Sequence, residues 1–590
     1  MKQFLKFMFA SFAGTVLTLI LILLLFAGMV ASISSMAQKQ SIKTKPHTVL
    51  HIAWKATIRD RTPQNPFENF DFNTMKPNRS LGLNDILKDI GKAAKDPNVD
   101  GIFLDMGSVP AGIATTEEIY NKLKDFKKSG KFIVSYANNY DQKAYYLASL
   151  SNKIYLNPEG VVLFKGLSAQ VMFLKNLLDK LDIKAQVIRG PDNKYKSAVE
   201  PLLLDKMSAA NRQQTKALLQ SIWGNMLAAL SENRHVSVAE MNKLADNLTL
   251  SDAEQALKHH FIDGIAYRDM VLDSIKKRVG TKPDYMEFAQ YDNVQPEKKK
   301  ERISRNSIAV IYALGDISKG KSRNNNIIGS ATLAEAIREA RTNKHVKAIV
   351  MRVNSPGGDA QASDIIRREV ALAKKAKPFI VSMGNVAASG GYWISTDASY
   401  IFAQPTTITG SIGVFGIIPD FQGFMNKKLG ITFDKVMTNK NADFVDIMAP
   451  MSPLQKQKLN AGITRIYKNF VTLVARTRHL RKSFVDSIAR GHVWAGSEGL
   501  KLGLVDSLGG LQDAIAYAAK KAKLGKNYRI INYPKRKEFL QELMEEFSGK
   551  VQSRILANKL QVFEPYLSGI QTFSQMKGVQ ARLPYVMKIE

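Results

Sequence analysis

The stretch VKAIVMRVNSPGG, residues 346–358, is an apolar run that ends in two glycines, the pattern of a buried strand followed by a turn. Its opening VKAIVMR has the same pattern as VDGIFLD at residues 99–105, which lies 247 positions earlier. The same offset relates FIVS at residues 132–135 to FIVS at residues 379–382. An offset that persists between separate stretches indicates that the chain contains one unit twice.

Each copy alternates short β-rich runs with amphipathic helical stretches, such as residues 333–340 and 365–375. This alternation is typical of βαβ units around a mostly parallel sheet, so we expect an α/β fold. The predicted organisation is an anchor and juxtamembrane segment at 1–46, a first copy at 47–292, a polar linker at 293–306, a second copy at 307–525 and an unassigned tail at 526–590.

The N-terminal segment carries no charged residue from Phe7 to Gln38. A helix of about 20 apolar residues crosses the roughly 30 Å hydrocarbon layer of a bilayer, so this segment predicts a transmembrane helix. A cleaved signal peptide is the alternative, because Ser35-Met36-Ala37 has the small-x-small form of a cleavage site. Lysines on both sides of the segment indicate its orientation only weakly.

The composition of the chain excludes several classes of protein. Its 590 residues contain no cysteine, which rules out disulfides, thiolate zinc sites and a cysteine nucleophile. The formal net charge of +32 is scattered along the chain and not gathered into a basic arm. Scattered basic charge on an anchored protein fits attraction to anionic lipid surfaces, so we expect membrane lipid and no nucleic acid among its partners.

A candidate nucleophile lies in GNVAASGGYWIS, residues 384–395, where Ser389 is surrounded by alanines and glycines. Subtracting the offset of 247 gives Gln142, so the first copy has no serine at the matching position. Gly357 and Gly358 follow a predicted strand at the carboxyl end of the sheet, where α/β proteins bind ligands. Their amides would suit an oxyanion hole, and the alternative is a turn that merely needs glycine geometry.

A serine hydroxyl needs a base beside it to act as a nucleophile, and none lies within that stretch. The histidine candidates are His259, His260 and His492. A buried lysine is the other option, because burial disfavours its charged form and leaves an amine that can accept a proton. Composition does not choose between these two kinds of base.

Four motifs together resemble a known family: RVNSPGG at 352–358, MGNVAASGGYWIS at 383–395, TGSIGVFG at 409–416 and KYKSAVEP at 194–201. The chain resembles the long, duplicated form of the signal peptide peptidase A family, also called protease IV. That resemblance implies tandem duplicated ClpP/crotonase-like α/β domains behind an N-terminal transmembrane helix. It also implies a membrane-anchored serine endopeptidase with a Ser-Lys dyad.

The resemblance assigns roles to individual residues. Ser389 becomes the nucleophile, Lys196 the general base, and Ser411 the hydroxyl that orients the lysine amine. The amides of Gly357 and Gly358 would line the oxyanion hole. Adding 247 to the lysine position gives Asp443, so each copy would keep one member of the dyad. The base would then come from the other copy, with Lys194 as the neighbour that could be mistaken for it.

The family also implies substrates, assembly and location. Its substrates are remnants of cleaved signal peptides and other short or unfolded peptides, and it needs no metal or other cofactor. It implies a ring-like homo-oligomer, with a tetramer expected. It places a single-pass protein in the bacterial inner membrane, with the catalytic part on the periplasmic side.

Rival functions rest on weaker patterns. GDISKGKS, residues 315–322, satisfies the P-loop pattern, but such a loop must run directly into a helix, and helical periodicity resumes only near Thr332. We therefore predict no ATP hydrolysis. A thioester-processing crotonase relative and a non-catalytic membrane scaffold of the same fold remain as alternatives to a peptidase.

Overall fold

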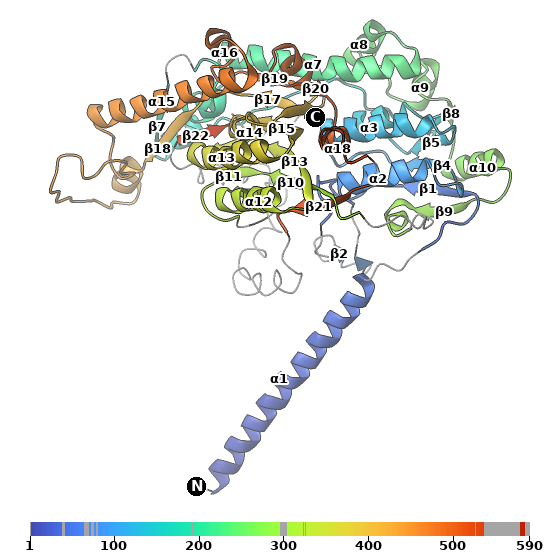
Figure 1. Ribbon diagram of the computed structural model, residues 1–590, viewed down its shortest axis with the longest axis horizontal. Coiled ribbons are helices and arrows are strands. Elements are labelled where there is room, and N and C mark those ends of the chain that lie inside the picture. Colours follow the sequence, from blue (N-terminus) through green and yellow to red (C-terminus); the bar gives the residue numbers. More distant parts are fainter. Residues whose placement is uncertain are drawn as a thin grey trace.

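The body of the protein contains two mostly parallel sheets, one built from each copy (Figure 1). The computed structural model describes residues 2–37, 42–63, 70–71, 76–77, 81–190, 193–294, 304–322, 324, 326–525, 527–535 and 579–583. Most of the predicted linker 293–306 and most of the predicted tail 526–590 lie outside these ranges.

The sheet of the first copy is parallel throughout, in the order β8-β6-β5-β4-β1-β9. The second copy repeats this order as β20-β16-β15-β13-β10-β21 and adds β17 and β19 beside β15. The strands are β1 Thr48–Ile52, β4 Val99–Asp105, β5 Phe132–Ala137, β6 Lys153–Leu156, β8 Gly264–Ile265 and β9 Asp284–Glu287, then β10 Ser307–Leu314, β13 Val346–Ser355, β15 Phe379–Ala388, β16 Tyr400–Ala403, β17 Ile408–Gly410, β19 Val493–Ala495, β20 Ser507–Leu508 and β21 Arg529–Tyr533.

The matched order extends the second copy beyond the predicted boundary at residue 525. Strand β21 pairs with β10 as β9 pairs with β1, so residues 529–533 complete the second sheet. The first part of the tail is therefore a structural part of the second copy, which the sequence pattern did not indicate.

Helices cover both faces of the second sheet, which explains why its central strands are continuous apolar runs. Ile349 and Met351 of β13 pack toward α12 Ser330–Thr342 and α13 Ala360–Ala376. Ala348 and Val350 of the same strand pack toward α18 Leu511–Lys521 on the opposite face. Alternate residues of one strand thus enter two different cores.

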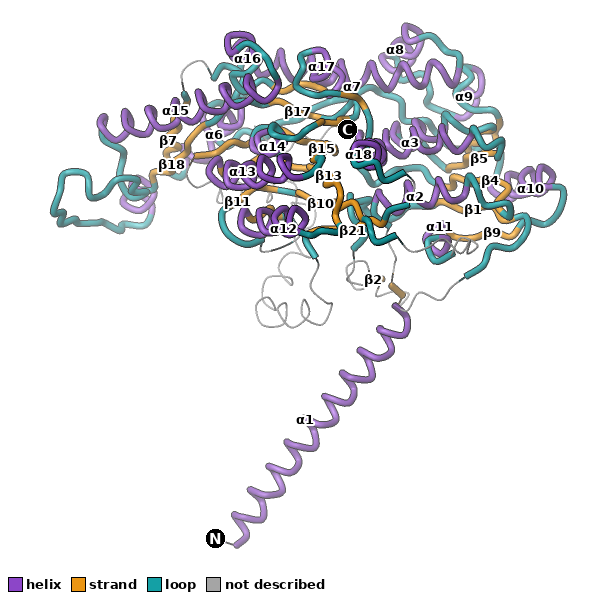
Figure 2. Tube along the Cα trace, in the orientation of Figure 1, coloured by secondary structure: helices purple, strands orange, loops and turns teal. Residues whose placement is uncertain are grey.

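Two long helices repeat the duplication in detail. Helices α7 Ala209–Arg234 and α15 Pro453–Arg478 each have 26 residues and lie along the side of the body opposite the N-terminal helix α1 Lys2–Ala37 (Figure 2). Each is capped by a serine whose hydroxyl accepts the amide three residues on, and each ends at a histidine with φ of 56°. The remaining helices are α2 Leu83–Ala93, α3 Ile113–Lys127, α4 Gln142–Ala148, α5 Lys175–Lys180, α6 Glu200–Leu203, α8 Val238–Asp246, α9 Ala253–Lys258, α10 Arg268–Val279, α11 Phe288–Tyr291, α14 Gly390–Ser395, α16 Lys482–Ile488 and α17 Gly496–Lys501.

A third, mixed sheet joins the two copies, in the order β12-β11-β14-β22-β18-β7. Its strands are β7 Lys184–Arg189, β11 Asp316–Ser318, β12 Ile327–Gly329, β14 Gly357–Asp359, β18 Phe415–Asp420 and β22 Val579–Arg582. Because the GDISKGKS segment contains β11 and is followed by β12, it leads into a strand and not into a phosphate-binding helix. A separate short pair joins β2 Phe70–Asp71 and β3 Lys76–Pro77.

A buried ion network ties the copies together. The guanidinium of Arg352, at the end of the second copy's VKAIVMR run, is fully buried and bonds Asp60 at 2.6 Å and also Glu118. Both carboxylates belong to the first copy. Removing one partner of such a buried pair leaves an uncompensated charge at a cost of about 3–5 kcal/mol, so loss of either carboxylate should weaken the packing of the two copies.

Helix α1, Lys2–Ala37, is 36 residues long and projects from the body (Figures 1 and 2). Across the described ranges, none of the helices meets the combination of length and apolarity that crossing a membrane requires. The transmembrane helix predicted in residues 1–46 is therefore unconfirmed.

Candidate active site

Ser389 lies where strand β15 turns into helix α14, and its side chain is fully buried. Its backbone has φ of 55° and ψ of −114°, a conformation that is costly for a residue with a side chain and is typical of functional positions. A Cβ on the next residue, Gly390, would stand 2.7 Å from the hydroxyl of Ser363. The small residues around the serine are therefore required by the close packing of this turn.

Lys196 reaches the serine from the first copy. It lies between β7 and a short 3-10 turn, Ser197–Val199, and its side chain is fully buried. Its Nζ is 2.8 Å from Ser389 Oγ, 2.9 Å from Ser411 Oγ and 3.1 Å from the carbonyl oxygen of Ser411. The structure thus brings together three residues that are separated by as much as 215 positions in the chain.

Burial lowers the pKa of the Lys196 ammonium well below its usual value. Desolvation by burial is the cause of this shift. A neutral amine has two hydrogens and one lone pair. When the hydrogens bond the hydroxyl and carbonyl oxygens of Ser411, the lone pair is left for the hydroxyl hydrogen of Ser389.

The predicted glycine pair lies against the serine turn. Gly357 has φ of 104° and Gly358 has φ of 156°, and both belong to β14. A Cβ on the first would stand 2.7 Å from the amide nitrogen of Gly390, and a Cβ on the second 2.0 Å from the carbonyl oxygen of Ile317. Both positions exclude a side chain. The amide of Gly357 donates to Ser355 Oγ at 3.2 Å, and the oxyanion-hole role of the pair stays a prediction.

Two alternative bases, His492 and Lys194, make their contacts away from Ser389. The Nδ1 atom of His492 lies 2.8 Å from the carbonyl oxygen of Val493, and its ring stacks on Trp494 at 3.9 Å between centroids. Burial lowers the pKa of this histidine. Lys194 is exposed, and its ammonium lies 5.6 Å from the ring centre of Tyr195. Within the described residues, neither side chain bonds Ser389.

Gln142, the first-copy counterpart of the serine, has a structural place. Its side chain accepts from the amides of Lys165 and Gly166 at 2.8 Å and donates to the carbonyl oxygen of Gly166 at 2.9 Å. The position that holds the Ser389 hydroxyl in the second copy therefore holds, in the first copy, a side chain that fixes the backbone at Lys165 and Gly166.

Two residues that position Lys196 gave no signal in the sequence. Gly491 has φ of 85°, and a Cβ there would stand 2.5 Å from the backbone nitrogen of Lys196. Gln214 of α7 donates to the carbonyl oxygen of Tyr195 at 3.0 Å and to Ser197 Oγ at 3.1 Å, on either side of the lysine. Only the approach of distant segments in three dimensions reveals either role.

Replacing Gly491 with alanine is expected to lower kcat roughly 100-fold, because displacing a reacting group by about 1 Å has an effect of that size. The new Cβ must push the Lys196 backbone away, and the left-handed φ strains the substitution further. Steady-state peptidase kinetics and a melting curve measure the effect. Gly280→Ala is the matched control, since Gly280 has a similar φ of 82° but a Cβ added there would have no neighbouring atom within 4 Å. Equal losses of kcat in the two variants would contradict the positioning role.

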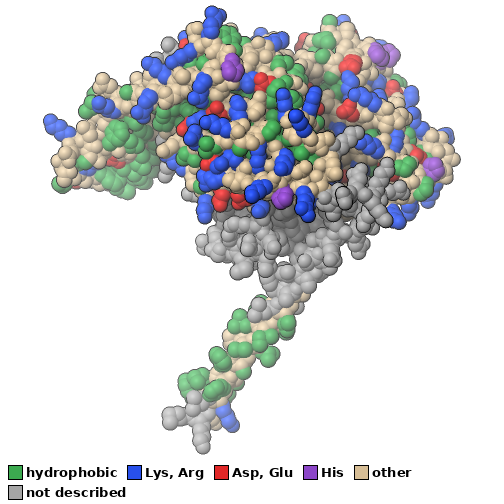
Figure 3. Space-filling model, in the orientation of Figure 1, with side chains coloured by type: hydrophobic (Ala, Val, Ile, Leu, Met, Phe, Trp, Pro, Cys, Tyr) green, Lys and Arg blue, Asp and Glu red, His purple; other side chains and the backbone are tan. Residues whose placement is uncertain are grey.

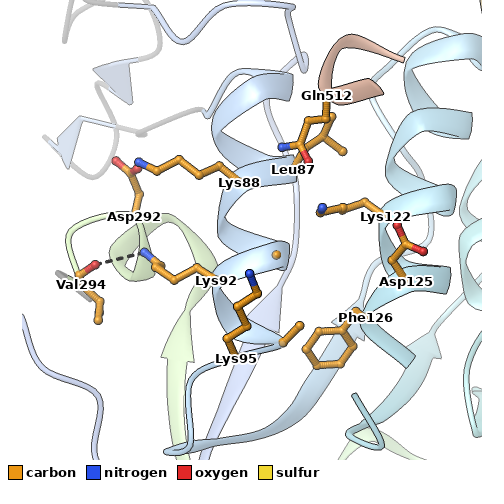
Figure 4. Close-up of a pocket in the computed structure, with 12 residues that line it drawn as sticks. Leu87, Lys88, Lys92, Lys95, Lys122, Asp125, Phe126, Asp292, Val294 and Gln512 are labelled. Carbon is orange, nitrogen blue, oxygen red and sulfur yellow. Dashed lines mark hydrogen bonds between the residues drawn. The ribbon is translucent and has the colours of Figure 1, made fainter. Parts of the chain in front are cut away.

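A cavity near the surface lies away from this site. It has a volume of about 540 Å³ between α2 and α3 and is lined by Lys88, Lys92, Lys95 and Lys122 (Figure 4). The ammonium of Lys92 is held by the carbonyl oxygen of Val294 at 3.1 Å. No predicted site residue lines this cavity.

Comparison with known proteins identifies the class. The chain matches the description "Peptidase family S49" over residues 125–282 and again over residues 371–525. It therefore belongs to this family and is a serine peptidase. It is 39% identical over 485 residues to "Protease 4" of Salmonella typhi, a match that covers 80% of this chain and 77% of that protein. It is 32% identical over 462 residues to "Serine protease SPPA, chloroplastic" of Arabidopsis thaliana, covering 77% of this chain and 68% of that protein.

These matches confirm the family that the motifs indicated and the duplication of its unit. They also decide for an enzyme over a non-catalytic scaffold, and for a peptidase over a thioester-processing enzyme. A solved structure of a ClpP1 mutant from Listeria monocytogenes covers 35% of this chain and 94% of its own at 14% identity and a TM-score of 0.24. The α/β class is confirmed by the sheets, whereas its ClpP/crotonase-like assignment stays a prediction.

Proposed function

We propose that the protein hydrolyses peptide bonds with Ser389 as the nucleophile and Lys196 as its general base. The observation that carries this proposal is the 2.8 Å separation of Lys196 Nζ and Ser389 Oγ in a fully buried setting. A serine needs an adjacent base, and a lysine needs burial to become one.

The mechanism follows from this arrangement. The neutral amine of Lys196 takes the hydroxyl proton as Ser389 Oγ attacks the substrate carbonyl, while Ser411 keeps the amine aimed at the serine. Amides of the Gly357-Gly358 loop would stabilise the oxyanion. The lysine ammonium then gives its proton to the leaving amine of the substrate. The neutral amine of Lys196 next takes a proton from water, and this water hydrolyses the acyl-enzyme.

For substrates, we propose remnants of cleaved signal peptides and other short or unfolded chains. The resemblance to signal peptide peptidase A supports this class. The full burial of Ser389 and Lys196 also supports it, because only an extended segment can approach a buried hydroxyl.

We further propose that α1 holds the protein in the bacterial inner membrane as a single-pass anchor, with the catalytic body on the periplasmic side. Large apolar side chains of α1 are exposed, as expected of a helix that faces lipid. They are Phe4, Phe7, Met8, Phe9, Phe12, Val16, Leu17, Leu19, Ile20, Leu21, Ile22 and Leu24.

A homo-oligomer, expected to be a ring-like tetramer, would explain an exposed apolar arm at residues 429–447. This arm projects between β18 and α15 and shows as a hydrophobic patch at the edge of the body (Figures 1 and 3). Its exposed members are Leu429, Ile431, Phe433, Val436, Met437, Phe444, Val445 and Ile447. The matching segment of the first copy contains β7, which pairs with β18 of the second copy. Since the first-copy segment packs on a second copy, the equivalent arm of the second copy would pack on the first copy of another molecule.

The substrate class is tested with the purified full chain in detergent. A synthetic peptide of apolar signal-peptide sequence and an unfolded protein are expected to be cleaved, and a stably folded protein is expected to stay intact, as read by mass spectrometry. Cleavage of the folded protein at a comparable rate would contradict the restriction to extended chains.

A further inference from the structure

Strands β13 and β15 pair irregularly just before both reach the site. Val353 lies opposite Met383 and Ser355 lies opposite Ala387, so β13 has one residue, Asn354, between these pairs where β15 has three. The residues in excess form a bulge in β15. A bulge bends the strand that carries it, and bulges are over-represented next to active sites. The shape of this bulge therefore affects where the serine turn stands relative to β13.

The side chain of Asn354 holds the bulge. Its Oδ1 atom accepts the backbone amide of Val386 at 3.2 Å. A Cβ on Gly384 would stand 3.0 Å from Asn354 Cγ, so the amide group packs closely on the bulged strand. Asn354 comes three residues before Gly357, and Val386 comes three residues before Ser389. This hydrogen bond therefore joins the strand that leads to the glycine loop to the strand that leads to the nucleophile.

A buried carboxylate of the first copy fixes that asparagine. Asp60 Oδ2 accepts from Asn354 Nδ2 at 2.8 Å, and Asp60 Oδ1 accepts from Arg352 Nε at 2.6 Å. An ionised carboxylate only accepts hydrogen bonds, so the Asn354 amide turns its nitrogen to Asp60 and its oxygen to Val386. Arg352 also donates to the carbonyl oxygen of Met383 at 3.1 Å. Asp60 thus braces both strands beside the bulge.

Helix α3 of the first copy holds the bulge at a second point. Asn385, inside the bulge, accepts the amide of Thr115 at 3.0 Å and donates to its hydroxyl at 2.9 Å. A Cβ on Gly112, the N-cap residue of α3, would stand 2.3 Å from Asn385 Oδ1. The bulge is therefore held between Asp60 and α3.

The described strands β4 and β5 of the first copy show no such bulge. They pair without a shift in register, from Gly101 opposite Phe132 to Asp105 opposite Tyr136. Subtracting the offset of 247 from 352 and 354 gives Asp105 and Gly107, so neither the guanidinium nor the side-chain amide is repeated there. The bulge and its asparagine thus occur in the copy that carries the serine, as expected if they serve the reaction.

We infer that Asp60 is a positioning residue for peptide hydrolysis, which acts through Asn354 to fix the glycine loop against the serine turn. This inference rests on the proposed function, because it takes Ser389 as the nucleophile and the amides of the glycine loop as oxyanion donors. Such donors act on charge that develops in the transition state. A displaced loop therefore lowers kcat and leaves KM nearly unchanged, because substrate binding does not use that charge.

Exchanging the two side chains tests these hydrogen bonds. In Asp60→Asn, two donors meet whichever way the amides turn, because Arg352, Asn354 and the Val386 amide all supply hydrogens. In Asn354→Asp, two carboxylates meet. In the double variant Asp60→Asn with Asn354→Asp, the new amide donates to the new carboxylate, which still accepts from Val386. Every hydrogen bond of the network is then restored.

Each single variant is expected to lower kcat roughly 10-fold to 100-fold with KM nearly unchanged, the effect of a misplacement of up to about 1 Å. The double variant is expected to return kcat to within about 3-fold of the wild type, because the two positions are coupled. Steady-state kinetics of the full chain in detergent, with a melting curve for each variant, measure this. Wild-type kcat in both single variants would overturn the inference, and so would a double variant no more active than the weaker single.

Asp263→Asn is the matched control. Asp263 also pairs with an arginine, Arg234 at 3.3 Å, and accepts the amide of Ile154 at 2.8 Å, and both partners belong to the first copy. This variant should melt at a lower temperature with kcat unchanged. An equal loss of kcat here would show that the effect follows from general stability, against the positioning role.

Asn354→Ala guards against misfolding of the charged variants. Asn354 is only half-buried, so water can reach the groups that it leaves, and the fold should persist. Its kcat should still fall roughly 10-fold to 100-fold, because a water does not tie β13 to β15 as a side chain does. A folded Asn354→Ala variant with unchanged kcat would overturn the inference.

Ser389→Ala, measured beside these variants, separates failure of this inference from failure of the proposed function. If Ser389→Ala is inactive while Asp60→Asn and Asn354→Ala keep the wild-type kcat, the nucleophile stands and the positioning role fails. If Ser389→Ala keeps its activity, the proposed function fails first, and the inference falls with it.

Discussion

Replacing Ser389 with alanine is expected to lower kcat by at least about 1,000-fold, since loss of a nucleophile removes the covalent step entirely. The fold should persist, because alanine is smaller than serine and the turn around it is built of small residues. Peptide hydrolysis measured by mass spectrometry, with a melting curve for the fold, gives the answer.

Gln142→Ala is the matched control for this experiment. It removes the side chain at the equivalent position of the first copy, where three backbone hydrogen bonds depend on it. We expect a lower melting temperature with the activity of folded molecules nearly unchanged. Comparable loss of kcat in both variants would contradict the assignment of the nucleophile to the second copy.

Replacing Lys196 with alanine is expected to lower kcat by about 100-fold to 10,000-fold, the range that a general base contributes. Lys196→Arg should be as inactive, because a guanidinium does not release its proton. In the wild type, the rate should climb with pH along one ionisation and level off below about 10.4, the value for a free lysine, because burial lowers the pKa of this amine.

Lys194→Ala is the control and should keep both the rate and the pH profile, because Lys194 is exposed and lies outside the site. Ser411→Ala should shift the profile or lower its plateau, since it removes one acceptor of the amine at 2.9 Å. A dead Lys194→Ala variant beside an active Lys196→Ala variant would show that the base was assigned two residues away from its true position.

The same lowered pKa makes stability depend on pH. Between the pKa of Lys196 in the folded protein and about 10.4 in the unfolded chain, unfolding takes up a proton, so the free energy of unfolding rises with pH through that window. Below the folded pKa both states hold the proton, and the dependence ends. Lys196→Met should therefore melt at a higher temperature than the wild type at neutral pH, which differential scanning calorimetry can measure.

Much of the fold could be predicted because periodicity and repetition are local properties of the chain. The apolar run at residues 346–358 indicated a buried strand, and the offset of 247 indicated a second copy of the same unit. The structure repeats the strand order of one copy in the other, as duplication requires. Strand β21 was missed because a five-residue edge strand has too short a pattern to separate it from a tail.

The site was less accessible to the same reasoning. Local sequence pointed to a hydroxyl at Ser389 among small residues, but it left histidine and lysine open as the base. Only the family motifs singled out Lys196. The lowering of its pKa arises from burial between copies, and burial is a property of packing that no stretch of residues carries by itself.

The sequence by itself therefore determined the α/β class, the duplication and the family, because periodicity, the repeat offset and the motifs are all features of the order of residues along the chain. The tertiary structure alone decided what surrounds the reacting groups. It placed an amine from one copy 2.8 Å from a hydroxyl of the other, set Gly491 against the lysine backbone and laid the C-terminal strand across the glycine loop. These contacts join residues between 193 and 295 positions apart. At such separations, no local sequence pattern indicates which groups meet, because the packing of complete domains determines it.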